Sequence, residues 1–256
     1  MHKFIIIVLS LVVSMLQAQS VDTLRVMTYN LRFGELATLE QFAAYIKSHD
    51  PDLVALQECD WKTSRIRAPK QAGKAFVNEI AYHTGLFGLY GKSIEYGGGY
   101  YGIGILSKYP IVKSERIFLP NPEPKKEQRV MLLAEIELPN QHTITFVSTH
   151  LEVSSAAIRK AQFQFITEKL KTIKTPIILA GDFNASPDEF SQLDGFVQWL
   201  NLTDSSITFP GSNPKMKIDY ILGYPKEKMK MFATCTDSLS HLSDHYPVYS
   251  KIIIQY

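Results

Sequence analysis

The sequence predicts an α/β fold, a four-layer α/β sandwich in which two mainly antiparallel sheets pack face to face with helices outside. Predicted strands outnumber predicted helices, and strands such as 52–58 and 176–183 are apolar on both faces, as is typical of strands buried between layers. A chain of 256 residues, 45% of them hydrophobic, can bury one large core. No stretch rich in proline, glycine or serine divides residues 19–256, so we expect them to form a single domain.

The elements have recognisable boundaries. A first helix at 38–49 can be capped by Thr38 and is ended by Asp50-Pro51. Further helices are expected at 71–84 and 187–194. The clearest helix is 154–173, with an apolar stripe of Ile158, Ala161, Phe165, Ile166, Leu170 and Ile173. Strands are expected at 23–31, 52–58, 86–90, 101–107, 111–118, 130–138, 143–149, 176–183, 217–223 and 246–255.

Residues 1–18 are typical of a secretory signal peptide. Lys3 supplies the positive start, and the apolar run 4–16 is shorter than the roughly 20 residues that a membrane span needs. We therefore expect cleavage near Ala18 and a secreted or periplasmic protein; an uncleaved anchor or a buried strand is the alternative. In an exported protein Cys59 and Cys235 could form one disulfide, or they could remain as two buried thiols. The net charge of +2 gives no general electrostatic argument for nucleic acid or membrane.

Polar side chains stand where apolar strands give way to loops, which is where sites gather. Singly, each has a structural interpretation: Asn30 can cap a turn, and His150 can be a hydrogen-bonded structural residue. Glu58 is harder to explain, because a carboxylate that closes an apolar strand is costly unless it is paired or ligated. The joint occurrence favours a site. Its members are Asn30, Glu58, His150, Asp182, Asn184, Asp219, Asp244 and His245.

The stretch LAGDFNASP, residues 179–187, predicts a holder for phosphate and water. In an extended strand Asp182 and Asn184 project to the same side. Gly181 allows a close backbone approach, and we expect Pro187 to end the strand. Glu58 offers a hard oxygen ligand suited to Mg²⁺ or Mn²⁺. Zinc-ligand spacing, a Walker loop and a Gly-x-Ser-x-Gly elbow are all missing from the sequence, so metal-assisted hydrolysis remains as the favoured chemistry.

Seven strings, in this order, resemble the endonuclease/exonuclease/phosphatase superfamily. They are MTYNLR (27–32), LVALQE (53–58), GIGILSKYPI (102–111), VSTHLE (147–152), LAGDFNASP (179–187), IDYIL (218–222) and LSDHYPV (242–248). The resemblance covers essentially all of the chain after the signal. It implies the four-layer fold already inferred and the cleavage of phosphoester bonds with a divalent metal, Mg²⁺ or Mn²⁺.

The resemblance also implies roles for the metal-binding residues. Glu58 looks like the principal metal ligand, with Asn30 and Asp244 nearby. One departure concerns position 32, where abasic-site endonucleases carry an aspartate two residues after the asparagine. This chain has Arg32 there, so a second carboxylate on that metal is lost.

For catalysis the resemblance implies a set of five residues. His245 looks like the catalytic histidine beside the scissile phosphate, oriented by Asp219. Asp182 and Asn184 look like the pair that positions the attacking water and the phosphate oxygens. His150 matches a histidine that contacts the phosphate in the sphingomyelinase and deadenylase branches. In the implied mechanism water attacks phosphorus in line, and protonated His245 and His150 donate to the developing charge.

The substrate is less well defined. Arg65 and Arg67 lie in the basic loop 60–74 and could grip a second phosphate or belong to a solvated loop, and Arg129 could reach the site. Tyr101 stands on the glycine-rich segment 96–102, where rings can stack on a substrate or simply pack. We predict hydrolysis of a phosphodiester in a phospholipid headgroup or of a related phosphoester.

Two alternative functions stay open. One is a secreted endonuclease or exonuclease acting on DNA or RNA. The other is a non-catalytic binding protein, in which Glu58, Asp244 or His245 would be expected to be lost, whereas all three are present. Nothing in the sequence implies a stable protein partner, and we expect a monomer.

Overall fold

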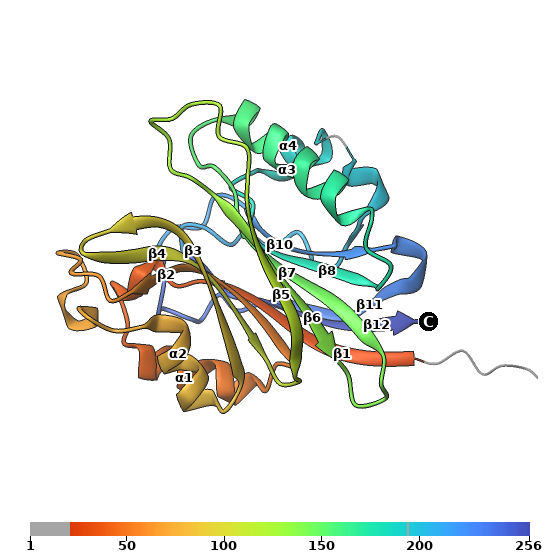
Figure 1. The fold of residues 1–256 in the computed structure, drawn as a ribbon, viewed down its shortest axis with the longest axis horizontal. Coiled ribbons are helices and arrows are strands. Elements are labelled where there is room, and N and C mark those ends of the chain that lie inside the picture. The colour runs from red at the N-terminus through yellow and green to blue at the C-terminus, as the bar shows by residue number, and fades with distance from the viewer. Residues whose placement is uncertain (1–20, 194) are drawn as a thin grey trace, which may run out of the picture.

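The computed structural model describes residues 21–193 and 195–256, and it contains two six-stranded sheets packed face to face (Figure 1). The predicted signal peptide, 1–18, lies outside the described residues. The first sheet has the order β11-β12-β1-β2-β4-β3, and the second has the order β5-β6-β7-β8-β10-β9. The strands are β1 (Val21–Asn30), β2 (Leu53–Trp61), β3 (Phe87–Tyr96), β4 (Gly99–Ser107), β5 (Ile111–Phe118), β6 (Val130–Glu137), β7 (Thr143–His150), β8 (Ile177–Asp182), β9 (Leu200–Asn201), β10 (Asp219–Tyr224), β11 (Met229–Thr236) and β12 (Val248–Gln255).

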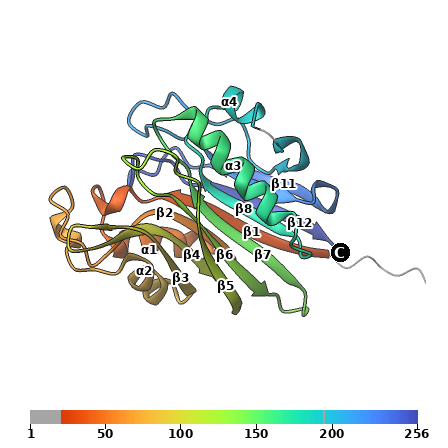
Figure 2. The same cartoon turned by 45° about the horizontal axis from the view of Figure 1, so that its top comes forward.

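Helices cover the outer face of each sheet, which confirms the predicted α/β sandwich. Helices α1 (Leu39–His49) and α2 (Phe76–Thr84) pack on the first sheet, and α3 (Ala156–Leu170) and α4 (Pro187–Ser191) pack on the second. Figure 2 shows α3 lying across the outer face of the second sheet. The central core lies between the sheets, so the strands are apolar on both faces as predicted.

The path of the chain explains which strands are parallel. Strands β1 to β4 belong to the first sheet, β5 to β10 form the second, and β11 and β12 return to the first. The parallel pairs among the described strands are β1 with β2 and β7 with β8. Each pair is joined through a helix, α1 or α3, because a parallel connection needs a long crossover. The other strand pairs are antiparallel, and β12 lies between β1 and β11 in the first sheet.

Several elements differ from the prediction. Strand β11 was not predicted, because most of its residues are exposed on an edge strand and give no apolar run. The glycine-rich segment is a tight hairpin turn in which Gly97 and Gly98 have φ of 53° and 79°, so β3 and β4 are longer than expected. Helix α2 begins at Phe76 rather than at residue 71. In α3, Phe163 is fully buried and Phe165 only partly so.

The cysteine interpretations are both wrong. Cys59 is a buried free thiol in β2, and Cys235 is an exposed free thiol in β11, so they form neither a disulfide nor a buried pair. In the part of the chain that the structure describes, no helix is long and apolar enough to cross a membrane.

Gly181 allows β8 to approach β7 closely, and we expect Gly181→Ala to lower the free energy of unfolding. A Cβ atom at this position would overlap the backbone carbonyl oxygen of Thr149, which cannot move aside as a flexible side chain could. Overpacking of this kind costs about 1–3 kcal/mol, measurable by urea unfolding. The control Ser114→Ala, on the exposed face of β5, should change the same quantity by less than about 0.5 kcal/mol. Equal effects of the two substitutions would contradict this role of Gly181.

Candidate active site

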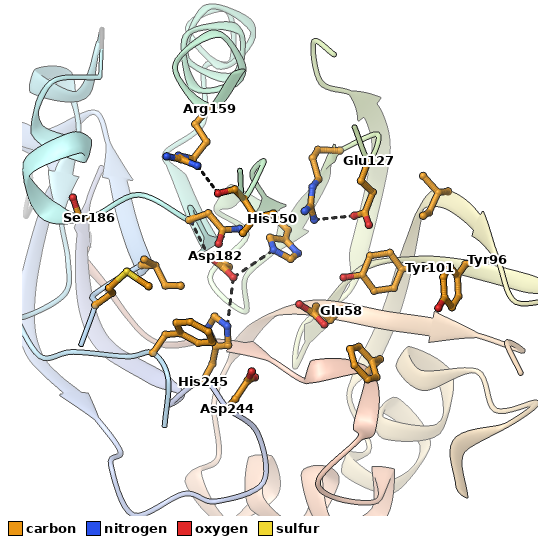
Figure 3. Close-up of a pocket in the computed structure, with 18 of the residues that line it drawn as sticks. Glu58, Tyr96, Tyr101, Glu127, His150, Arg159, Asp182, Ser186, Asp244 and His245 are labelled. Atoms are coloured by element: carbon orange, nitrogen blue, oxygen red, sulfur yellow. Dashed lines mark hydrogen bonds and ion pairs between the residues drawn. The ribbon is translucent and has the colours of Figure 1, made fainter. Parts of the chain in front are cut away.

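A cavity of about 660 Å³ opens where the ends of both sheets meet (Figure 3). Asn30, His150 and Asp182 end β1, β7 and β8, Glu58 lies near the end of β2, and Asp219 begins β10. The loop before β12 adds two further side chains. Nine of the twelve predicted site residues line the cavity: Glu58, Arg65, Tyr101, Arg129, His150, Asp182, Asn184, Asp244 and His245.

Asp182 is the centre of the site. Its Oδ2 atom lies 3.4 Å from Nε2 of His150 and 3.7 Å from Nε2 of His245, and it accepts a hydrogen bond of 3.1 Å from Nδ2 of Asn30. Burial, together with the charge of Asp219, raises the pKa of Asp182 to about 7. A carboxyl group that titrates near neutrality is suited to accept a proton from water.

The two histidines differ in charge. Burial lowers the pKa of His245, but the carboxylates of Asp219 and Asp182 outweigh it and raise that pKa to about 10. Nδ1 of His245 lies 3.0 Å and 3.2 Å from the oxygens of buried Asp219, which therefore fixes the imidazolium ring. Burial, with the positive charges of Arg129 and His245, holds the pKa of His150 well below its usual value. His150 is therefore neutral, contrary to the expectation that both rings are protonated.

Glu58 is directed into the cavity by an irregularity of β2. The register between β2 and β4 shifts between Leu56 and Cys59, and Glu58 has φ of 57°, in the left-handed region. A bulge of this kind re-aims a side chain. The Oε1 atom of Glu58 accepts a hydrogen bond of 3.3 Å from Nδ2 of Asn30, and burial raises the pKa of the carboxyl group.

Oxygen donors suited to a hard divalent cation are present around Glu58. Asn30 contacts Glu58 through its Nδ2 atom, while its Oδ1 atom accepts a 3.0 Å hydrogen bond from the backbone N–H of Arg32. Asp244 lines the same cavity, and one of its oxygens accepts a 2.6 Å hydrogen bond from Nη1 of Arg32. This donor set fits Mg²⁺ or Mn²⁺, which take one or two carboxylates and keep several waters. Asp182, Asp219 and His245 also bring possible ligand atoms within 4.8 Å of one another. A protonated His245 donates hydrogen bonds and does not act as a ligand, so Glu58 and its neighbours are the better candidate for a cation site.

The expected geometry of LAGDFNASP is wrong beyond Asp182, because β8 ends there. Asn184 has φ of 49°, its N–H donates to Oδ1 of Asp182 at 2.9 Å, and its Nδ2 donates to the carbonyl oxygen of Leu151. Asn184 therefore holds the loop around Asp182 and does not extend a strand. Pro187 opens α4, with Ser186 as its N-cap.

The predicted substrate-binding arginines lie in different surroundings. Arg129 and Arg65 line the cavity, and Arg65 makes two hydrogen bonds to Asp60, of 2.9 Å and 3.0 Å. Arg67 does not line it; its guanidinium donates to both oxygens of Glu35 on the exposed surface. Asn30 and Asp219 are also absent from the lining, but both contact residues that form it.

Sequence reasoning missed several lining residues, among them Glu127, Arg159 and Glu189. Glu127 precedes β6 in the polar string EQR, and Arg159 is a buried charge that interrupts the apolar stripe of α3. The polar string and the charge within the apolar stripe are the sequence features from which Glu127 and Arg159 could be identified. Glu189 gave none, because an exposed-looking acidic residue in the first turn of a helix is ordinary.

Comparison with known proteins gives a consistent result. A model of the Endonuclease/Exonuclease/phosphatase family matches residues 27–245. A solved structure of a protein of this family from Bacteroides thetaiotaomicron is 17% identical, with a TM-score of 0.74, and 93% of this chain and 100% of that chain are covered. A mannosyl-6-phosphatase from Bacteroides thetaiotaomicron VPI-5482 is 17% identical, with a TM-score of 0.72 and coverage of 90% and 99%. D. rerio TDP2 complexed with single-strand DNA product is also 17% identical, with a TM-score of 0.69 and coverage of 90% and 98%.

Proposed function

This chain belongs to the endonuclease/exonuclease/phosphatase family and is therefore a hydrolase of phosphoesters, and from this premise we propose its substrate class. Its substrate is a small phosphoester, either a phospholipid headgroup diester or a related soluble ester, rather than nucleic acid. The observation that carries the catalytic part is the position of Asp182 between a neutral and a charged histidine. Pairs of titratable groups held in opposite states identify acid and base roles.

In the proposed reaction a water oxygen bonds to phosphorus as the phosphorus–oxygen ester bond breaks. Asp182 accepts one proton of the water, and the leaving oxygen takes up a proton from the solvent. The His245 imidazolium donates to the charge that develops on the phosphate oxygens, while Asp219 holds the ring in place. Family members depend on a divalent metal; Glu58, with Asn30 and Asp244, would hold Mg²⁺ or Mn²⁺, which as a Lewis acid neutralises charge on the phosphate.

The state of the basic residues favours a small substrate over nucleic acid. A nucleic-acid site neutralises several backbone phosphates with lysine and arginine side chains. In the loop 60–74, Arg65 is bound to Asp60 and Arg67 to Glu35, so neither guanidinium is available without breaking an ion pair. The structural neighbours include both a mannosyl-6-phosphatase and a TDP2 complexed with single-strand DNA product, each 17% identical, so the preference rests on the state of these arginines.

A substrate panel tests the proposal. The protein would be assayed with Mg²⁺ or Mn²⁺ on sphingomyelin, inositol phosphates, bis-p-nitrophenyl phosphate, plasmid DNA and RNA. We expect turnover of the small or lipid esters, with a weak dependence on salt, and its loss in chelator until metal is restored. Cleavage of plasmid DNA or RNA with steep salt dependence would favour the nuclease alternative. Inactivity on every substrate would favour the non-catalytic alternative.

A further inference from the structure

Three arginine–carboxylate pairs border the cavity, and we call them the paired-arginine wall: Arg65 with Asp60, Arg129 with Glu127, and Arg159 with Glu189. Figure 3 shows Glu127 and Arg159 on the opposite side of His150 from Asp244. The Arg129 and Arg159 pairs therefore lie beyond Asp182, where the part of a substrate attached to the phosphate would be bound. The Arg65 pair borders the cavity beside the rings of Phe33 and Tyr96.

The Arg129–Glu127 pair has unused hydrogen-bonding capacity. Arg129 is only 5% exposed and lines the cavity, yet among the described residues its Nε and Nη1 atoms have no hydrogen-bond partner of good geometry. Its Nη1 atom lies 2.9 Å from Oε1 of Glu127, which likewise lacks a hydrogen bond. Buried donors and acceptors without partners are costly. A ligand group that both donates and accepts would satisfy the two side chains together.

The Arg159–Glu189 pair positions a second hydrogen-bond acceptor. Nε and Nη2 of Arg159 donate to the two oxygens of Glu189 at 2.7 Å and 2.8 Å, and Nη1 donates to the carbonyl oxygens of Glu152 and Val153. Arg159 is thus almost fully used within the protein. The Glu189 carboxylate, which lines the cavity and is partly exposed, keeps lone pairs for a ligand.

The charges of the wall select against ionic groups. Each guanidinium is matched by a carboxylate, and Nε of Arg129 also lies 3.9 Å from Oε2 of Glu152, so the wall offers no excess positive charge to a second phosphate. A quaternary ammonium headgroup would need free aromatic faces. Arg65 already packs on the rings near it, with its guanidinium carbon 4.2 Å from the ring centre of Phe33 and 4.1 Å from that of Tyr96. The lining ring of Phe209 packs against His245, with 4.6 Å between ring centres. A neutral group rich in hydroxyls remains, because each hydroxyl both donates and accepts.

We propose that the paired-arginine wall binds the hydroxyl groups of a polyol, such as a sugar, cyclitol or glycerol unit, whose phosphoester lies beside Asp182 and His245. The inference rests on the proposed function and narrows its substrate class. Glu127 and Arg129 bind one hydroxyl or a neighbouring pair, and Glu189 binds another. The cavity volume of about 660 Å³ is within the range of small-ligand sites.

Matched ester pairs provide the test. Glycerol 1-phosphate is compared with n-propyl phosphate, and myo-inositol 1-phosphate with cyclohexyl phosphate, each as the monoester and as the methyl diester. We expect kcat/KM for at least one hydroxylated ester to exceed that of its partner by about 100-fold or more, because the partner leaves buried polar groups without hydrogen bonds. A further arm uses phosphatidylcholine vesicles that contain phosphatidylglycerol. Hydrolysis of the phosphatidylglycerol assigns the polyol to a lipid headgroup, and activity on soluble esters alone assigns it to a free polyol phosphate.

Glu127→Gln tests the assignment to the wall. We expect the preference for the hydroxylated ester to fall at least about tenfold, because the amide presents a donor where the carboxylate accepts. The ratio of the two kcat/KM values is a readout that a general loss of folded protein would not move. Glu115→Gln, on exposed β5 and outside the cavity lining, is the matched control and should leave the ratio unchanged.

The outcomes separate this inference from the proposed function. Turnover of bis-p-nitrophenyl phosphate together with equal rates for both members of each pair would overturn the polyol site and leave the hydrolase intact. A preference that persists in Glu127→Gln would overturn the role of the Glu127–Arg129 pair. Failure to hydrolyse any ester, bis-p-nitrophenyl phosphate included, would overturn the proposed function and with it this inference.

Discussion

Glu58→Gln will reduce kcat by about a thousandfold or more. The substitution keeps the size of the side chain and its place in the β2 irregularity, but it removes the negative charge assigned to the metal. Lewis-acid stabilisation of the transition state amounts to several kcal/mol, and each 1.36 kcal/mol corresponds to a factor of ten in rate. Steady-state hydrolysis of the best substrate of the panel would measure the loss.

Two comparisons make the Glu58 result interpretable. Glu115→Gln makes the same chemical change on exposed β5 and should keep wild-type kcat. Thermal unfolding should show that Glu58→Gln stays folded, since the carboxyl group makes one hydrogen bond of 3.3 Å to Asn30. A Glu58→Gln enzyme within tenfold of wild type would mean that the metal is held elsewhere, with the Asp182–Asp219–His245 group as the next candidate.

His245→Ala is expected to lower kcat by about 10²–10⁴, the usual cost of losing a positioned proton donor or acceptor. The ring is buried, is fixed through two short contacts to Asp219, and carries a positive charge beside Asp182. Its removal deprives the developing phosphate charge of a charged hydrogen bond. Single-turnover kinetics with saturating enzyme would separate the chemical step from binding.

His241 offers a control within the same loop. It lies four residues earlier and is exposed, so His241→Ala should leave kcat within about twofold, because substitutions on the surface are usually near neutral. Asp219→Asn should give a smaller fall than His245→Ala, because it loosens the ring without removing it. If His241→Ala and His245→Ala were equally slow, the effect would belong to the loop and not to the imidazolium.

The sequence was most informative where a polar residue ends an apolar strand. Glu58 stands out because a carboxylate that closes an apolar strand is costly, and His150 and Asp182 are added by their joint occurrence with it. The structure gathers all three in one cavity, although β2 continues past Glu58 to Trp61. The same contrast predicted the two-sheet core and the strands that α1 and α3 connect.

The contrast between apolar strands and polar strand ends did not identify residues whose partners are distant in the sequence. Arg159 and Glu189 are 30 residues apart and meet only because α3 and α4 cover the same sheet. Asn184 was placed on a strand because alternation continues through it, whereas its left-handed backbone ends that alternation. Strand β11 was missed because an edge strand exposed to solvent has no burial pattern to detect.

The return of the chain to the first sheet has a consequence for biosynthesis. β1 leaves the ribosome well before β12, which pairs with it from Val21 opposite Gln255. The segment just ahead of β12 also delivers His245, so a nascent chain that already holds Glu58 and Asp182 still lacks the histidine that contacts Asp182 and Asp219. The cavity is therefore completed only after the segment that carries His245 has been made, and a chain that stops before this segment leaves β1 as an open sheet edge.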